Sequence, residues 1–472
     1  MLGRPKPLTT IAQLNHDVLL NIFDWYRLDN TMDDFDRSWN LERWWYKLIQ
    51  VCHVWRRIIL ASPAYLKLHL VCTYGTPVEA MLTHSPPFPL IIYYPAKLGE
   101  MAPEDKEGAV FALLHCERVR RIHIELSAAD LHDLVKVMDN DYPMLQRLVI
   151  RSRTENQAHT DTVTLPRKLR APLLHRLALS NMVLPINSTF LSSAAGLVAL
   201  RLQNFSAGAD FHPEHFVAQF SAMSHLKMVE IHFNFPIPNR EIEQRLLRAP
   251  VTRVTLPSLR LLAFRGSSAY LEGILERLNA PYLQTLNVEF FNQLTFDLTS
   301  LLQLSHSMHD LKRHAAEVHF DKDFVSLIVD PRDKGGGAYP FHLQVDCKPL
   351  DWQAFCAAQI CSALAPLFIR TESLRLGFHK DGLPETWQAD VDHEQWHTLL
   401  RTFGGVKTLQ LAGGLVGDLF RSLQLPGGDL PQELLPGLQE LVPRGWVHTD
   451  DALTSFVTAR GAAGRPIRLV RN

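Results

Sequence analysis

The sequence is poor in the features that mark several large protein classes. Its 472 residues include six cysteines, none in a Cys-x-x-Cys pair, which is too few for a disulfide framework. We therefore expect free thiols in the core and a reducing compartment, the cytoplasm or the nucleus. No apolar run approaches the ~20 residues of a membrane span, and the first 20 residues lack a signal-peptide pattern. These absences predict no membrane association.

Excess charge and catalytic motifs are also missing. The 48 Lys and Arg residues balance 49 Asp and Glu residues, so there is no basic footprint for nucleic acid. The sequence contains no HExxH, GxSxG or zinc-ligand spacing, and no GxGxxG after a strand. The glycine-rich stretch 330–337 lacks the spacing of a phosphate-binding loop, and His393 and His397 have no third ligand beside them. We expect no enzymatic activity, no cofactor and no metal site.

Leucine, in contrast, is in large surplus, with about 74 residues. Many of them fall in a recurring pattern, apolar-x-x-apolar-x-apolar. Clear copies begin at Val119, Leu145, Leu174, Leu197, Leu226, Leu259 and Leu283, and again at Val406 and Leu438. Weaker copies lie at Val318–Phe320, Leu343–Val345 and Leu374–Leu376. The seven clear starts from 119 to 283 are separated by about 27 residues on average, inside the ~20–29 range of leucine-rich repeats.

This periodicity predicts the fold. Each copy reads as a short strand with one apolar face, and segments 214–223, 241–247 and 269–278 between the strands read as helices. Stacked units share a continuous core that one unit cannot form alone. We expect an α/β architecture, an irregular leucine-rich-repeat β/α solenoid over residues 71–472, with a parallel sheet on its concave face. Residues 445–472 are predicted to form its C-terminal cap, with a helix starting at Asp450 or Asp451 and a strand within 466–470.

The turns after the strands deviate from the ideal repeat, which has Asn or Cys three positions after the last strand apolar residue. Asn234 occupies that position, whereas Asn181, Asn204 and Asn292 are displaced by one. We therefore expect irregular turns rather than a regular asparagine ladder.

The N-terminal part has a different, helical periodicity. Apolar residues in 14–26 repeat at helical spacing, with Asn15 as the expected N-cap. Residues 44–61 form a second helical pattern, in which a break near 49–52 is expected. Residues 28–43 between them are an acidic insertion, expected to be a solvated loop. We expect Cys52 to be a small buried residue.

These residues resemble a known family. Leu14-x-x-Asp17-Val18-Leu19-x-x-Ile22-Phe23, Leu48-x-x-Val51-Cys52-x-x-Trp55-Arg56 and Pro63-x-x-Leu66 resemble an F-box-like domain of the kind found in mushroom-forming fungi, here over residues 10–70. The segments 68–78, 435–441 and 451–466 resemble the same group. One departure is Asn15-His16, where the family usually has Pro-Pro or Pro-Glu.

The resemblance implies a substrate-recognition subunit of a Skp–cullin–F-box ubiquitin ligase. The helices would bind a Skp-type adaptor, and through it a cullin–RING ligase, while the solenoid would bind a target protein. The residues expected at or supporting the adaptor surface are Leu14, Val18, Leu19, Ile22, Phe23, Leu48, Val51, Trp55, Ile58 and Leu66. The alternative is an interaction scaffold outside any ligase, in which the F-box is only structural.

Outward-facing strand positions identify a candidate target-binding face. Five arginines are expected to form a basic stripe across neighbouring strands: Arg121, Arg147, Arg151, Arg176 and Arg201. Because strands lie about 4.8 Å apart, these guanidinium groups can act together on one acidic or phosphorylated segment. The alternative interpretation is that they are ordinary solvated charges on the strand face.

Overall fold

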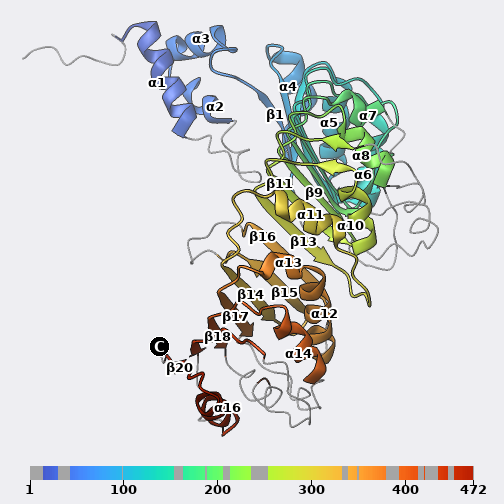
Figure 1. The fold of residues 1–472 in the computed structure, drawn as a ribbon. Helices are drawn as coiled ribbons and strands as arrows, with labels where there is room; N and C mark the ends of the chain where they lie inside the picture. The colour runs from blue at the N-terminus through green and yellow to red at the C-terminus, as the bar shows by residue number, and fades with distance from the viewer. Residues whose placement is uncertain are drawn as a thin grey trace, which may run out of the picture. The chain divides into compact units, whose positions relative to one another are not determined.

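The computed structural model describes residues 14–29, 43–97, 99–153, 163–185, 189–205, 213–234, 253–331, 339–347, 350–378, 393–412, 419, 434–444 and 451–470. Most of the acidic insertion, the helix expected at 241–247 and most of the glycine-rich stretch lie outside these residues. The chain divides into two compact units, Met1–Ala194 and Ala195–Asn472. In each unit helices lie along one face of a sheet (Figure 1).

The first unit begins with helices and continues with a parallel sheet in the order β1-β2-β3-β4-β6. A short pair, β5 and β7, lies apart from it. The strands are β1 (Leu70–Cys72), β2 (Leu90–Tyr94), β3 (Val119–Ser127), β4 (Arg147–Arg153), β5 (Val163–Thr164), β6 (Arg176–Ser180) and β7 (Met182–Val183). The helices are α1 (His16–Asp29), α2 (Trp44–Leu48), α3 (His53–Ala61), α4 (Val78–His84), α5 (Pro103–Leu114), α6 (Ala128–Val137) and α7 (Thr189–Ser193).

The helices α1 to α3, which we call the helical module, pack around a small core. The ring of Phe23 in α1 meets that of Trp55 in α3 edge-on, with 4.9 Å between ring centroids. The expected break falls between α2 and α3, where the Cys52 thiol accepts a hydrogen bond from the backbone N–H of Trp55 and so caps α3. Cys52 is therefore exposed rather than buried, which corrects the expectation drawn from its apolar neighbours.

Side chains at the start of α2 close the free edge of the sheet. Among the described residues, strand β1 pairs only with β2, and the carbonyls of His69 and Val71 point away from that partner. The Trp45 indole donates to the His69 carbonyl at 3.3 Å, and the Arg43 guanidinium donates to the Val71 carbonyl at 3.1 Å. Trp45 also packs against Phe88, with 5.9 Å between centroids. An edge strand that would otherwise offer unpaired carbonyls is covered.

The repeat pattern of the sequence reappears as the register of the sheet. Equivalent apolar residues of successive copies stand opposite one another on β3, β4 and β6. Two such ladders are almost completely buried beneath the helices: Ile122, Leu148 and Leu177, and Ile124, Ile150 and Leu179. Each copy thus contributes the same positions to one continuous core.

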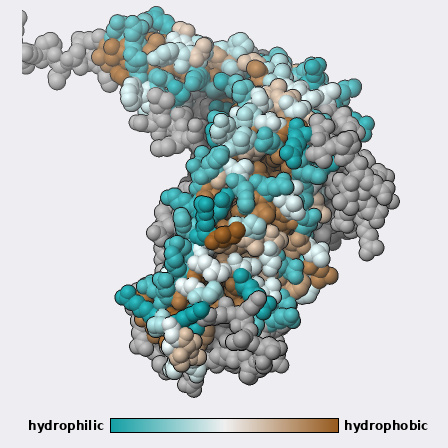
Figure 2. Space-filling view, in the orientation of Figure 1, coloured by the Kyte–Doolittle hydropathy of each residue, from teal (hydrophilic) through white to brown (hydrophobic). Residues whose placement is uncertain are grey.

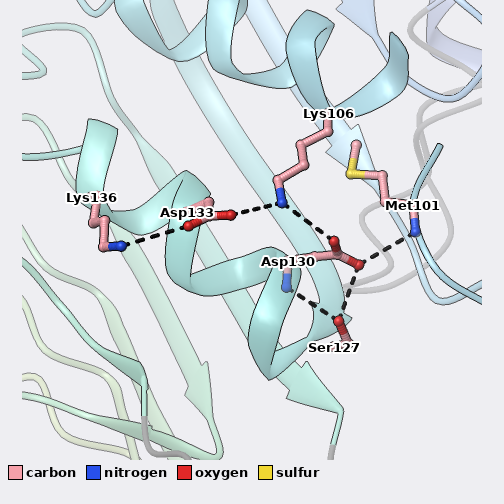
Figure 3. Close-up of polar contacts among 6 residues, drawn as sticks. All are labelled: Met101, Lys106, Ser127, Asp130, Asp133 and Lys136. Carbon is pink, nitrogen blue, oxygen red and sulfur yellow. Dashed lines mark hydrogen bonds and ion pairs between the residues drawn. The ribbon is translucent and has the colours of Figure 1, made fainter. Parts of the chain in front are cut away.

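Polar contacts connect the helices of successive repeats (Figure 3). The Ser127 hydroxyl accepts from the backbone N–H of Asp130 at 3.3 Å and caps α6. The Asp130 carboxylate in turn accepts from the Met101 N–H at 3.3 Å. Lys106 of α5 reaches both Asp130 at 3.6 Å and Asp133 at 2.8 Å. The hydrogen bond from Lys106 holds the pKa of the Asp133 carboxyl below its ordinary value. These contacts fix α5 against α6.

The second unit continues the repeats in the strand order β8-β9-β11-β13-β16-β15-β14-β17-β18-β19-β20, with β10 and β12 paired separately. Its strands are β8 (Ala199–Phe205), β9 (Met228–Phe233), β10 (Val254–Thr255), β11 (Leu261–Gly266), β12 (Leu278–Asn279), β13 (Thr285–Phe290), β14 (Ala315–Phe320), β15 (Phe324–Val329), β16 (Phe341–Asp346), β17 (Ser373–Phe378), β18 (Thr408–Ala412), β19 (Glu440–Arg444) and β20 (Arg468–Leu469). Its helices are α8 (Pro213–Phe220), α10 (Ser268–Leu275), α11 (Thr299–Ser307), α12 (Leu350–Ala363), α13 (Ala365–Phe368), α14 (His393–Arg401) and α16 (Asp451–Ala462).

The sheet of this unit is mostly but not wholly parallel, which corrects the prediction of a parallel sheet. The weak copies of the repeat do form strands β14, β16 and β17, but β15 pairs antiparallel with both β14 and β16. Only residues 321–323 separate β14 from β15, and the Asp321 N–H donates to the Phe324 carbonyl at 2.9 Å. So short a connection permits only an antiparallel hairpin. The segment 315–346 therefore contributes three strands, β14, β15 and β16, whereas each copy of the predicted repeat contributes one.

The irregular turns have a conformational cause. Asn181 and Asn204 both adopt left-handed backbone conformations, with φ of 53° and 51°, which asparagine tolerates better than most residues. The Asn181 amide still donates to the Ser152 carbonyl of the preceding repeat at 2.7 Å. Asn234, at the ideal position, donates to the Asn204 carbonyl at 3.3 Å. Displaced and regular asparagines thus make the same kind of bond between repeats.

The described C-terminal elements are the helix α16 and the short strand β20. Helix α16 starts at Asp451, and β20 pairs parallel with β19, placing Arg468 opposite Glu440. The Arg460 guanidinium of α16 is buried and donates to the Leu435 carbonyl at 3.1 Å. The helix is thereby held against the turn that precedes β19.

The covered edge at β1 predicts that two tryptophan substitutions differ in their effect on the stability of the first unit. Trp45→Ala removes a side chain that is 3 % exposed together with its hydrogen bond, and is expected to destabilise the first unit by about 3–5 kcal/mol. Trp25→Ala, at a side chain that is 70 % exposed, is the matched control and should change stability by less than about 0.5 kcal/mol. Urea unfolding followed by circular dichroism measures both. Equal effects would contradict the assigned role of Trp45.

Candidate functional site

The outer face of α1 is apolar although it faces solvent. Val18, Ile22, Trp25 and Tyr26 are spaced as one helical stripe and are 43, 45, 70 and 44 % exposed. In Figure 2 hydrophobic side chains gather over the helical module. We call these four residues the α1 stripe. A contiguous apolar surface of this kind is typical of a protein-binding site.

The residues predicted for the adaptor surface fall into three groups in the structure. Leu19, Phe23, Ile58 and Leu66 are buried and form the core of the helical module. Leu14, Leu48 and Trp55 are partly buried. Val18, Ile22 and Val51 are exposed and are the predicted residues that can touch a partner directly.

Sequence reasoning did not assign Trp25 to this surface. Its side chain is the most exposed of the α1 stripe. The signal was present in the sequence, because Trp25 lies at i+3 from Ile22 and i+7 from Val18, on the same side of the helix. Tyr65 lies beside the same helix, where its hydroxyl donates to the Asn21 side chain at 3.0 Å.

The second candidate surface is the sheet face that does not carry helices. In the first unit Arg121, Arg147 and Arg176 occupy matched positions on β3, β4 and β6, so that each stands directly opposite the next. We call these three residues the arginine row. All three are partly exposed, and the residues beside them, Ile122, Leu148 and Leu177, are buried on the helix side. The structure therefore places these three predicted residues side by side on neighbouring strands.

The other two predicted arginines have a different environment. Arg151 stands opposite Glu125 and forms an ion pair with it at 3.5 Å. Arg201 belongs to the second unit, where it stands opposite Glu230 and donates to its carboxylate at 2.9 Å. Their charges are each matched by a carboxylate on the neighbouring strand, so neither joins the arginine row.

An apolar strip runs beside the arginine row on the same face. The next row of the register contains Tyr93, His123, Val149 and Ala178. Val149 and Ala178 are 1 and 3 % exposed, and the Tyr93 and His123 rings lie 5.0 Å apart. The face thus combines a line of positive charge with an apolar floor.

The corresponding face of the second unit is electrostatically compensated. Arg265 stands opposite Glu289 and contacts it at 3.0 Å, and it also contacts Asp346 at 2.9 Å. Arg375 stands opposite Glu317 at 3.4 Å. On the first unit's face, in contrast, arginine stands opposite arginine on neighbouring strands.

A hollow of about 560 Å³ in the second unit lies at the starts of α10 and α11. The Glu272 carboxylate accepts from the N–H groups of Ser300 and Leu301 at 2.6 and 2.9 Å. Burial nevertheless raises the pKa of the Glu272 carboxyl above its ordinary value. The Gln293 carbonyl accepts from the Ser268 N–H at 3.1 Å. These polar groups satisfy helix N-terminal amides, and we assign them a structural role.

Two features are absent from the described part of the chain. No group of three or more His, Cys, Asp or Glu side chains there is arranged to hold a metal ion. None of the described helices combines the length and apolar character needed to cross a bilayer.

Comparison with known proteins gives a limited result. No protein-family model matches the chain, and no curated protein sequence matches it. Among solved structures, the leucine-rich repeat-containing protein LegL7 of Legionella pneumophila is similar over 85 % of this chain and 99 % of its own length. The two are 11 % identical, with a TM-score of 0.26.

The burial of His342 predicts that the stability of the second unit depends on pH. His342 of β16 is partly buried, and burial lowers the pKa of its imidazole below the ordinary value of about 6.5. Below that pH the unfolded chain takes up a proton more readily than the folded chain, so stability is lost as the pH falls. His342→Gln should reduce the loss of urea resistance between pH 7.5 and pH 5. Parallel pH profiles for the parent and the variant would contradict this role.

Proposed function

We propose that this chain is a non-enzymatic receptor that joins two proteins. The helical module binds a Skp-type adaptor of a cullin–RING ubiquitin ligase, and the helix-free sheet face binds a target protein. The α1 stripe is the observation that carries the proposal. Four large apolar side chains remain partly exposed on a helix that also contributes Leu19 and Phe23 to a buried core, so this stripe is available to a partner.

The resemblance of residues 14–66 to an F-box supports the adaptor as that partner. Of the residues quoted for the resemblance, Val18 and Ile22 are in the α1 stripe, while Leu19 and Phe23 hold the helix in place. A helix face with i, i+4 and i+7 apolar anchors suits docking into a groove of a partner protein.

Under this proposal the chain contributes proximity rather than chemistry. The adaptor would connect the helical module to the ligase, and the bound target would present its lysines to a charged ubiquitin-conjugating enzyme. All bond making and breaking would then belong to the partner subunits.

The departure at Asn15-His16 favours one alternative. Both residues are exposed at the start of α1, beside Val18. If they prevent adaptor binding, the α1 stripe serves a scaffold that binds another protein outside the ligase.

Co-purification with a Skp-type adaptor tests the proposal. Ile22→Glu combined with Trp25→Glu places two charges in the α1 stripe and should weaken adaptor binding by more than about tenfold, because interface anchors dominate binding energy. Leu114→Glu at the end of α5, where the side chain is 58 % exposed, is the matched control and should bind like the parent.

Circular dichroism verifies that both variants fold. If the folded parent chain does not bind the adaptor, the ligase proposal fails and the scaffold alternative replaces it. If the double variant binds as well as the parent, the α1 stripe is not the adaptor surface.

A further inference from the structure

Two cysteines of the second unit bring their thiols together where a helix meets the sheet. Cys347 directly follows β16, and Cys356 lies in the middle of α12. Their side chains are buried, with exposures of 3 and 0 %, and the two thiols share a hydrogen bond. The contact therefore joins the end of a strand to the helix that follows it in the chain.

Backbone and amide contacts hold this pair of thiols in place. The Cys347 N–H donates to the Asp323 carbonyl at 2.9 Å, and the Cys347 carbonyl accepts from the Gln353 side-chain amide at 2.7 Å. The same amide donates to the Asp321 carbonyl at 2.5 Å. Cys356 follows Gln353 by about one helical turn. This part of α12 is thus tied both to the end of β16 and to the connection between β14 and β15.

The two thiols differ in acidity. The hydrogen bond with Cys347 lowers the pKa of the Cys356 thiol below its ordinary value, although burial acts in the opposite direction. The same contact is the largest of the causes that raise the pKa of the Cys347 thiol. Burial raises the pKa of Cys361, which lies further along α12. Cys356 is therefore the thiol of α12 that its surroundings favour as a thiolate, and Cys347 is the partner that keeps its proton.

We propose that Cys347 and Cys356 form a reversible disulfide when the protein meets a peroxide, so that the junction of β16 and α12 is a site of oxidative modification. The thiolate is the reactive form of cysteine, and the sulfenic acid that a peroxide produces condenses with a neighbouring thiol. The pair lies in the second unit and the α1 stripe in the first, so neither proposal depends on the other.

The reaction consumes one peroxide molecule for each pair of thiols. The Cys356 thiolate attacks one peroxide oxygen, the O–O bond breaks, and the departing hydroxide takes up the proton that Cys356 lost and leaves as water. The Cys347 sulfur then attacks the sulfenic sulfur. The S–S bond forms, the S–O bond breaks, and the hydroxyl group leaves as a second water with the proton of Cys347. The two thiols are oxidised by two electrons, and the peroxide is reduced to two waters.

Burial slows this reaction without preventing it. A peroxide reaches the pair when the start of α12 opens locally, as helix ends do in folded proteins. The two sulfur atoms, already in hydrogen-bond contact, then need to approach to about 2.05 Å. The resulting cross-link closes the short loop between positions 347 and 356 and restricts the unfolded chain. The oxidised protein should therefore resist unfolding more than the reduced protein.

Peptide mapping of the full chain tests the proposal. The protein is treated with hydrogen peroxide, its remaining thiols are blocked under denaturing conditions, and it is cleaved on the N-terminal side of Asp346 and Asp351, which places Cys347 and Cys356 on different peptides. These should be recovered as one linked pair that dithiothreitol separates. In the same samples the midpoint of urea unfolding should rise by roughly 0.5 M or more on oxidation and return on reduction.

Two substitutions in α12 form a matched pair. Cys356→Ala removes one of the two thiols and should abolish both the linked peptides and the rise in midpoint. Cys361→Ala removes a similarly buried thiol from the same helix and should leave both unchanged. Cys347→Ser removes the other thiol, and its hydroxyl can keep the contact with the Val345 carbonyl that the thiol makes at 3.4 Å. It should behave like Cys356→Ala, and it replaces that variant if circular dichroism shows that Cys356→Ala does not fold.

Several results would overturn the proposal. One is the absence of the linked pair after a treatment that oxidises Cys52, whose side chain is exposed. Another is a disulfide that joins Cys361 to either cysteine in place of the proposed bond. A rise in midpoint that persists in folded Cys356→Ala, or linked peptides that dithiothreitol does not separate, would also overturn it.

Discussion

In-register parallel pairing is the constraint on which most of this structure depends. Each strand begins at the same point of the repeat, so equivalent residues of successive copies come to lie opposite one another. Leucine and isoleucine ladders on one side follow directly, and helices bury them. The same register acts on the other side of the sheet, where it decides which polar residues meet. The buried core and the polar pattern of the helix-free face are therefore two outcomes of one alignment.

Because of this register, the charges that meet on the helix-free face depend on which residue each copy has at a given position of the repeat pattern. When one strand carries arginine and the next carries glutamate, as at Arg201 and Glu230, the register produces an ion pair. When successive strands all carry arginine, as at Arg121, Arg147 and Arg176, the register places the arginines opposite one another. Ordinary solvated charges on separate surface loops would show no such dependence, because nothing would hold their neighbours in place.

Much of this organisation was predictable from the sequence, for reasons that particular residues make clear. The leucines at 145, 174, 226 and 259 begin copies whose strands appear where the pattern places them. The three members of the arginine row were predictable because they occupy one position of the pattern. The partners of Arg151 and Arg201 were not, since Glu125 and Glu230 are opposite them only once the strand register is known.

The hairpin of β14 and β15 was also missed, because Asp321–Asp323 reads as part of a repeat until the antiparallel bonds are seen. The cap formed by Cys52 depends on one backbone hydrogen bond that periodicity cannot reveal. The role of the helical module as an adaptor-binding unit stays a prediction.

The contact of Arg43 and Trp45 with β1 has a consequence for how the chain can be divided. Arg43 and Trp45 donate hydrogen bonds to the carbonyls of Val71 and His69, in and next to the first strand. The segment that carries α2 therefore also covers the N-terminal edge of the sheet. A solenoid expressed without residues 1–62 would present a bare strand to solvent, and a bare strand recruits other strands. Such a fragment would associate with copies of itself through an edge that the intact chain never offers. The short segment that carries α2 thus also protects the first strand of the sheet, and removing it would expose that strand.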